Sequence, residues 1–143
     1  MSDLPTLLKT LPQGYPFRMV DGVAGRQTGA WLQSRRVIGA DSCHLCGSHR
    51  TLPLYALLES LGQTAELFIR GESDASAVLV LAAVRELAIA RFPEVGSVLD
   101  IRAELRQKAG SFWETFIEAA VGGDRLASGV FVHAQRAKGP SHG

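Results

Sequence analysis

The architecture of this 143-residue chain follows from one segment, Leu52-Pro53-Leu54-Tyr55-Ala56-Leu57-Leu58-Glu59-Ser60-Leu61-Gly62-Gln63-Thr64-Ala65. Pro53 suits the first turn of a helix, because its φ is fixed near the helical value and its missing N–H would have no partner there. Apolar residues then recur at the i, i+3, i+4, i+7 spacing of a helix that packs on a core. They are Leu54, Leu57, Leu58, Leu61, Ala65 and Phe68. We predict one long helix that begins at Pro53 and ends near Arg70 and Gly71, where glycine can form a left-handed C-terminal cap.

The opposite face of this helix carries mainly polar residues. They are Tyr55, Glu59, Gly62, Gln63, Glu66 and Arg70. Periodicity alone makes Glu59 a solvated surface residue, because a carboxylate is rarely buried unless it is paired. Gly62 costs up to about 1 kcal/mol relative to alanine inside a helix, so its missing side chain is expected to let another group pack closely on this face.

The composition indicates one soluble domain. With 46% hydrophobic residues the chain can bury a sizeable core, which we place in residues 1–135, and residues 136–143 form a polar tail that we expect to be disordered. The net charge of +1, with acids and bases interspersed, argues against nucleic acid as a partner, and no apolar run is long enough to span a membrane. The N-terminus lacks a secretory signal and the two cysteines cannot form a disulfide framework, so we expect a cytoplasmic protein.

Short strands are predicted on both sides of the helix. Before it we expect strands at 17–23 and 30–38, separated by a turn within 22–29; after it we expect strands at 76–83, 87–92, 98–106, 111–121 and 126–135. The alternation of apolar and charged residues is clearest in 98–106, as in a sheet with one buried face. Gly122-Gly123-Asp124 favours a tight hairpin turn. The pattern predicts an α+β fold in which an antiparallel sheet curls around one long central helix.

Four segments resemble the hotdog-fold 3-hydroxyacyl-(acyl carrier protein) dehydratases. Leu11-Pro12-Gln13-Gly14-Tyr15-Pro16-Phe17-Arg18-Met19-Val20-Asp21-Gly22-Val23 is similar to their opening, Leu-Pro-His-Arg-Tyr-Pro-Phe-Leu-Leu-Val-Asp-Arg-Val. The helix shares their pattern of Pro, five residues, Glu, three residues, Gln. Glu86-Leu87-Ala88-Ile89-Ala90-Arg91-Phe92-Pro93 and Gly110-Ser111-Phe112-Trp113 resemble a later strand and the entry to the last hairpin. Within the family, the chain resembles the divergent dehydratase-like proteins of aryl-polyene or polyketide-type clusters.

The loop before the helix departs from this family. Active members carry Gly-His-Phe-Pro-Gly there, whereas this chain reads Cys43-His44-Leu45-Cys46-Gly47-Ser48-His49-Arg50. His44 matches the family histidine only if one extra residue precedes Glu59, and matching His49 shortens the loop by several residues. The alternative is that His44 and His49 are exposed loop residues without a catalytic role.

The resemblance implies elimination of water from a 3-hydroxyacyl thioester. A base removes the C2 proton and an acid protonates the departing C3 hydroxyl, and an imidazole with an opposed carboxyl group can do both. It therefore implies Glu59 as the acid or water-orienting group and His44 or His49 as the base. Backbone N–H groups at Leu54 and Tyr55, aided by the helix dipole, would bind the enolate oxygen. In the resembled enzymes these histidine and glutamate residues meet across a dimer interface, so a monomer lacks a complete site.

The resemblance also implies the partners. These are an acyl thioester of acyl carrier protein or coenzyme A, and a second hotdog subunit in a homodimer or heterodimer. No metal and no redox cofactor is required. Gln63 is expected to hydrogen-bond within the interface or beside the acyl tunnel, with a surface amide as the alternative. His133, in the last strand, is expected to be a packing or edge residue.

Two other functions of the same fold stay open. The altered loop favours a non-catalytic hotdog subunit that partners an active dehydratase. A thioesterase is the second alternative, because a carboxylate on this fold can activate water against the thioester carbonyl. Cys43, His44, Cys46 and His49 also form a weak candidate zinc set, although structural zinc sites normally join two separated ligand pairs.

Overall fold

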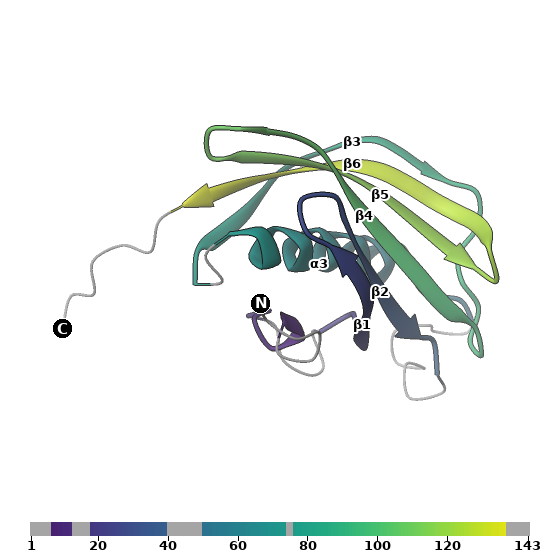
Figure 1. Ribbon diagram of the computed structural model, residues 1–143. Coiled ribbons are helices and arrows are strands. Elements are labelled where there is room, and N and C mark those ends of the chain that lie inside the picture. Colours follow the sequence, from purple (N-terminus) through teal and green to yellow (C-terminus); the bar gives the residue numbers. More distant parts are fainter. Residues whose placement is uncertain (1–6, 13–17, 40–49, 74–75, 137–143) are drawn as a thin grey trace.

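An antiparallel sheet curves around one long helix, α3 (Leu54–Glu72), in the computed structural model (Figure 1). The structure describes residues 7–12, 18–39, 50–73 and 76–136. The strands are β1 (Gly22–Gln27), β2 (Trp31–Val37), β3 (Val78–Ile89), β4 (Val98–Ala109), β5 (Phe112–Val121) and β6 (Asp124–Arg136). Their order in the sheet is β1-β2-β4-β5-β6-β3, and each neighbouring pair is antiparallel. The predicted α+β architecture is therefore confirmed.

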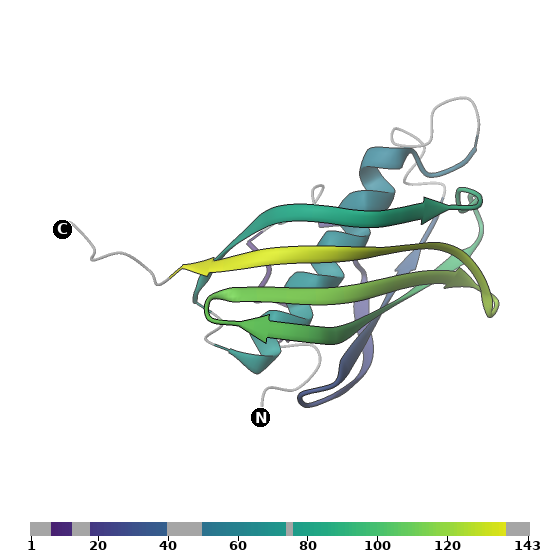
Figure 2. The same cartoon turned by 90° about the horizontal axis from the view of Figure 1, so that it is seen from above.

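The central helix lies in the concave face of the sheet and crosses the strands at an angle (Figure 2). The helix begins at Leu54, one residue after the predicted start, and the extended Pro53 is its N-cap. Leu57, Leu61, Ala65 and Phe68 of the apolar stripe are buried. Leu54 differs, because it lies in the first turn beyond the core and is 47% exposed. None of the helices among the described residues is long and apolar enough to cross a membrane.

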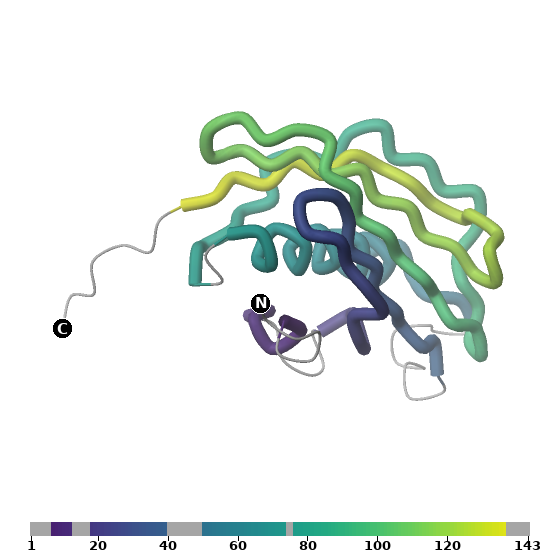
Figure 3. Tube along the Cα trace, viewed as in Figure 1, coloured from purple at the N-terminus to yellow at the C-terminus, as the bar shows by residue number. Residues whose placement is uncertain are grey.

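The other side of α3 is also covered. Figure 3 shows the described part of the chain that precedes β1 on the side of the helix away from the sheet. Leu7, Leu11, Met19 and Val20 of this segment belong to the buried core. Gln63 and Arg70 are buried as well, although the periodicity of the sequence placed them on a solvated face. The helix is therefore buried over more of its circumference than one apolar stripe requires.

The predicted glycine cap of the helix is wrong. Gly71 lies inside α3, which continues to Glu72 before Ser73 becomes extended. Arg26 of β1 donates a hydrogen bond from Nη2 to the Gly71 carbonyl oxygen (3.0 Å) and pairs with the Glu72 carboxylate (3.1 Å). An arginine side chain thus satisfies a terminal carbonyl that a left-handed glycine would otherwise help to satisfy. A Cβ at Gly71 would lie 2.8 Å from the guanidinium at the end of the flexible Arg26 side chain, which would have to shift to make room for it.

Two predicted strand boundaries are also wrong. β1 begins at Gly22 and runs through residues that were predicted as a turn. Glycines are tolerated in this edge strand, because the pairing with β2 shifts at a bulge between Val23 and Gly25. The segments 76–83 and 87–92 form one strand, β3, instead of two. Glu86 takes a positive φ of 53° inside a register shift, which lets the pairing with β6 continue past the charged residues.

The hairpin between β5 and β6 is as predicted. Gly122 and Gly123 have φ values of 59° and 85°, and the residues on either side, Val121 and Asp124, are paired. Two consecutive positive φ values are typical of the tight turn that matches the twist of a β-ribbon. This turn directs β6 back along the sheet, where it lies between β5 and β3.

Candidate active site

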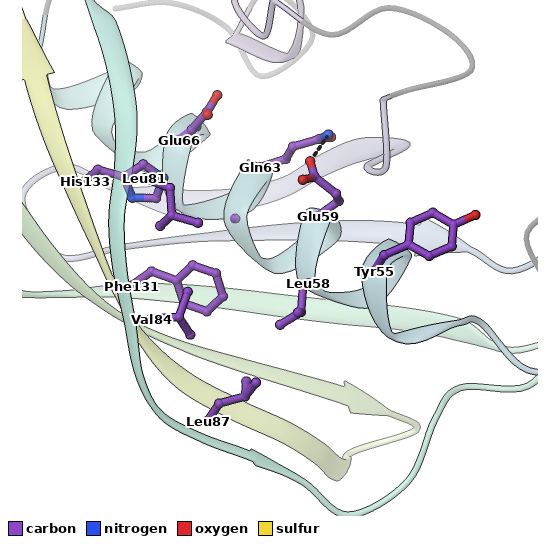
Figure 4. A pocket seen from close by; sticks show the side chains of 11 residues that line it. Tyr55, Leu58, Glu59, Gln63, Glu66, Leu81, Val84, Leu87, Phe131 and His133 are labelled. Atoms are coloured by element: carbon purple, nitrogen blue, oxygen red, sulfur yellow. Dashed lines mark hydrogen bonds between the residues drawn. The ribbon is translucent and has the colours of Figure 1, made fainter.

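An open pocket of about 400 Å³ lies between α3 and the strands β3 and β6 (Figure 4). The helix contributes Tyr55, Leu58, Glu59, Gly62, Gln63 and Glu66. The sheet contributes Leu81, Val84 and Leu87 from β3, and Phe131 and His133 from β6. The polar helix face predicted from the sequence is therefore the wall of a pocket, and Glu59, although exposed in the protomer, lines it.

Gly62 keeps the middle of the pocket open. A Cβ at this position would lie 3.7 Å from the ring of Phe131, which is ordinary van der Waals contact. A larger side chain would extend over the aromatic ring and fill the space between helix and sheet. Phe131 is the group nearest to this position, but it leaves room for a Cβ, so the close packing expected at Gly62 is not what the structure shows.

Gln63 joins the pocket to the N-terminal segment. Its Oε1 accepts a hydrogen bond from the backbone N–H of Met19 (2.7 Å), and its Nε2 donates to Oε2 of Glu59 (3.5 Å). Ser60, one turn before Thr64, donates to the carbonyl oxygen of Met19 (2.8 Å). Gln63 is 1% exposed, so it is not a surface amide. Its side chain anchors Met19 and limits the orientations open to the Glu59 carboxylate.

The helix N-terminus lies at one end of the pocket. The Pro53 carbonyl oxygen accepts hydrogen bonds from the N–H groups of Ala56 and Leu57, both at 3.1 Å. Leu54 and Tyr55 are 47% and 54% exposed, and Figure 4 shows the Tyr55 ring pointing away from the other lining side chains. Tyr55 is part of the pocket wall, whereas Leu54 is not among the described residues that line it.

Four residues of the predicted site lie outside the described residues. These are His44 and His49, the two candidate bases, and Cys43 and Cys46 of the zinc alternative. Residues 137–143 of the predicted tail also lie outside them, and β6 extends to Arg136. The described part of the pocket thus brings together three predicted site residues, namely Glu59, Gln63 and Tyr55.

Two titratable residues that line the pocket were missed as site residues from the sequence alone, namely Glu66 and His133. Burial lowers the pKa of His133 to about 4, with the charge of Arg70 acting in the same direction. Burial raises the pKa of Glu66; the charge of Arg70 opposes this shift and that of Glu59 reinforces it. Glu66 follows Glu59 at i+7 on one helix face, and His133 alternates with Phe131 along β6. Both spacings can be read from the sequence. Only the tertiary structure, however, shows that Glu66 and His133 line the same pocket.

The buried histidine predicts acid sensitivity. Because the pKa of His133 is about 4 in the folded state and the ordinary pKa of a histidine is 6.5, the unfolded chain binds more protons between these pH values. Stability conferred by neutral His133 should therefore fall as the pH is lowered through this window, by about 3 kcal/mol. The raised pKa of Glu66 acts oppositely, since the folded state keeps that proton to higher pH than the unfolded state does.

Urea unfolding at pH 7 and pH 4.5 would measure this effect. The wild-type protein is expected to lose more unfolding free energy between the two pH values than His133→Leu does, because leucine has no proton to bind. Equal losses in the two proteins would show that His133 is not the group responsible.

Comparison with known proteins relates the chain to curated relatives by sequence and to solved structures by fold. No family model matches. The chain is 31% identical over 136 residues to the 3-hydroxyacyl-(acyl-carrier-protein) dehydratase FabZ of Myxococcus xanthus, over 91% of this chain and 89% of that protein. It is 30% identical over 135 residues to FabZ of Granulibacter bethesdensis, over 90% and 79%. Among solved structures it resembles the dehydratase heterocomplex ApeI:P from Xenorhabdus doucetiae, with a TM-score of 0.79, 21% identity, and coverage of 92% and 91%.

Proposed function

Because this chain belongs to the hotdog-fold 3-hydroxyacyl-(acyl carrier protein) dehydratase family, we propose that it removes water from a 3-hydroxyacyl thioester to give a 2-enoyl thioester. The observation that carries the proposal is the position of Glu59 on the wall of a mainly apolar pocket of about 400 Å³. Pockets of this size and character, with a few polar groups, are typical of small-molecule sites. The apolar wall suits an acyl chain, and the carboxyl group suits proton transfer at its oxygen-bearing end.

Each residue then has a chemical role. The base, His44 or His49, takes the C2 proton, the C2–H electron pair forms the C2=C3 double bond, and the C3 hydroxyl leaves as water after Glu59 protonates or orients it. N–H groups at Leu54 and Tyr55 stabilise negative charge on the thioester oxygen. Gln63 is a positioning residue, since it acts through its hydrogen bond to Glu59.

The protein is further proposed to work as a dimer of hotdog subunits paired through β3. This strand is an edge of the sheet and has 12 residues, whereas the opposite edge, β1, has six. Five large apolar side chains of β3 are at least 37% exposed. They are Val78, Val80, Leu81, Val84 and Leu87. A long apolar edge strand is a template for pairing with a second chain, and three of these side chains also line the pocket, so the partner would help to close it.

A charge on this edge is expected to separate the subunits. Val80, which is 40% exposed and does not line the pocket, is the position for Val80→Lys. In a paired edge, the lysine would have to be desolvated, so the variant should be monomeric at concentrations where the wild type is dimeric. Light scattering after size-exclusion chromatography gives the mass directly. Val37→Lys, on an exposed position of β2, is the control and should stay dimeric.

The activity is tested with a 3-hydroxyacyl carrier protein as substrate and mass spectrometry as the readout. Loss of one water from the acyl group supports the dehydratase. Release of a free acid would instead support the thioesterase alternative, and unchanged substrate would contradict both activities for this chain alone.

A non-catalytic partner role is the second candidate, and one observation favours it. The sequence at 40–50 departs from the family motif that carries the histidine. In this case the isolated chain has no dehydratase activity, but adding it to a second hotdog chain raises the dehydration rate of that chain. Activity of the isolated chain would rule out this candidate.

A further inference from the structure

The wall that β3 contributes to the pocket has an unusual spacing. Its lining residues, Leu81, Val84 and Leu87, follow one another at intervals of three. In a regular strand, side chains three residues apart point to opposite faces of the sheet. The pairing of β3 with β6, however, shifts after Leu81 and again after Arg85. Each shift places one extra residue in β3, so all three apolar side chains reach the pocket.

The second shift turns Leu87 toward the helix. Glu86 lies within this shift and has a positive φ of 53°, a conformation that residues other than glycine rarely adopt. Gly129 of β6 leaves room for the leucine, because a Cβ there would lie 3.3 Å from Cδ1 of Leu87 and 3.4 Å from the ring of Phe131. A strained backbone persists only where the surrounding structure imposes it. Here the strain brings an apolar side chain into the pocket wall.

The two ends of this wall differ in chemistry. Figure 4 shows Leu81 beside His133, Leu87 at the opposite end, and Val84 between them. On the helix, Glu66 lines the pocket at the Leu81 end. An alkyl chain that ran toward this end would desolvate the carboxyl group without giving it a hydrogen-bond partner. The chemistry of the wall therefore favours the Leu87 end for an alkyl chain.

A hydrogen bond joins the helix to β3 beyond Leu81. Arg70, one turn after Glu66 on α3, is 7% exposed and donates from Nη1 to the carbonyl oxygen of Ala77 (3.1 Å), directly before β3. The arginine thus links helix and strand at the polar end of the wall. At the other end Leu87 is 39% exposed in the protomer, so a chain can extend past it.

We propose that the acyl chain runs from Glu59 along β3 toward Leu87, and that Leu87 determines how many of its carbons are bound. Glu86 is a positioning residue, because its left-handed backbone holds Leu87 in the wall. The inference rests on the proposed function, which places the reacting end of the acyl group at Glu59. Each methylene between helix and strand adds affinity, and carbons beyond Leu87 add none.

Calorimetric titration with unreactive analogues tests the inference without turnover. The analogues are pantetheine conjugates of unsubstituted saturated acyl groups of increasing length, in which carbon replaces the thioester sulfur. The affinity of the wild-type protein is expected to rise about fourfold with each added methylene and then to level off at one chain length.

Leu87→Ala and Leu81→Ala form a matched pair, because each shortens one partly exposed leucine of the same wall. Leu87→Ala should bind the long analogues about tenfold more weakly than the wild type does, and the short analogues within about twofold. Its affinity should therefore level off at a shorter chain. Leu81→Ala should keep the chain-length profile of the wild type. A selective loss of long chains in Leu81→Ala would place the chain at the polar end and overturn the inference.

Substitutions at Glu86 test the positioning role without shortening Leu87. Glu86→Gly relieves the strain of the positive φ and should keep the chain-length profile of the wild type. Glu86→Val disfavours that conformation, so this variant should lose affinity for long analogues as Leu87→Ala does. A wild-type profile in Glu86→Val would show that the left-handed backbone does not position Leu87.

The outcomes separate the two proposals. Equal affinity of the wild type for all chain lengths would overturn the inference even if dehydration is observed. A chain-length profile that changes in Leu87→Ala, in a protein that forms no enoyl product, would instead contradict the dehydratase proposal and leave the acyl site along β3 supported.

Discussion

Glu59→Gln is expected to lower kcat for dehydration by about 10² to 10⁴-fold, the range for loss of a general acid–base group. Glutamine keeps the shape of the side chain but cannot give a proton to the departing hydroxyl. The substitution should have little effect on stability, because Glu59 is exposed in the protomer and its hydrogen bond to Gln63 is long, at 3.5 Å. Enoyl formation by mass spectrometry and the thermal midpoint measure the two effects separately.

A surface carboxylate provides the control for this result. Glu104 lies on β4 outside the pocket, is exposed and pairs with Arg102, so Glu104→Gln should retain the wild-type rate. If Glu59→Gln also retained the wild-type rate, the carboxyl group would have no part in the elimination and the proposed mechanism would fail.

Leu61→Ala is expected to lower the free energy of unfolding by about 2 to 5 kcal/mol, as for other truncations of fully buried leucines. Leu61 is 0% exposed and belongs to the core between α3 and the sheet. The loss combines the transfer free energy of the removed carbons with the cavity that they leave. Urea denaturation followed by circular dichroism provides the measurement.

Leu54 is the matched comparison, because it belongs to the same apolar stripe of the sequence. It is 47% exposed, so Leu54→Ala should change the unfolding free energy by about 0.5 kcal/mol or less. Similar losses at the two positions would show that Leu54 is buried in solution, as a partner subunit at the helix N-terminus would cause.

The elements that were correctly predicted depend on local chemistry. Pro53 directly precedes the first helical residue, where its fixed φ and its missing N–H are tolerated, and both properties are read from one residue. The turn at Gly122 and Gly123 follows from their freedom to take positive φ. The alternation in β4 needed only neighbours along the chain, and Leu99, Ile101 and Ala103 are indeed buried.

The incorrect predictions concern positions where groups distant in the sequence override the conformation that the local sequence favours. Gly71 did not cap the helix, because Arg26, 45 residues away, satisfies the carbonyl at that end. The charged residues Arg85 and Glu86 did not end a strand, because pairing with β6 continues on either side of them. Neither Arg26 nor β6 can be assigned to these positions from a local window of sequence.

By itself, the sequence determined the family, the central helix with strands on both sides of it, and the carboxyl group on that helix, since each depends on patterns within continuous segments of the chain. The tertiary structure alone decided that Glu59 and Glu66 face the same pocket as His133. A helical period identifies the face that packs on a core, but it does not show what covers the other faces. That depends on where the curvature of the sheet places β3 and β6 against the helix, and on which side chains those strands direct inward.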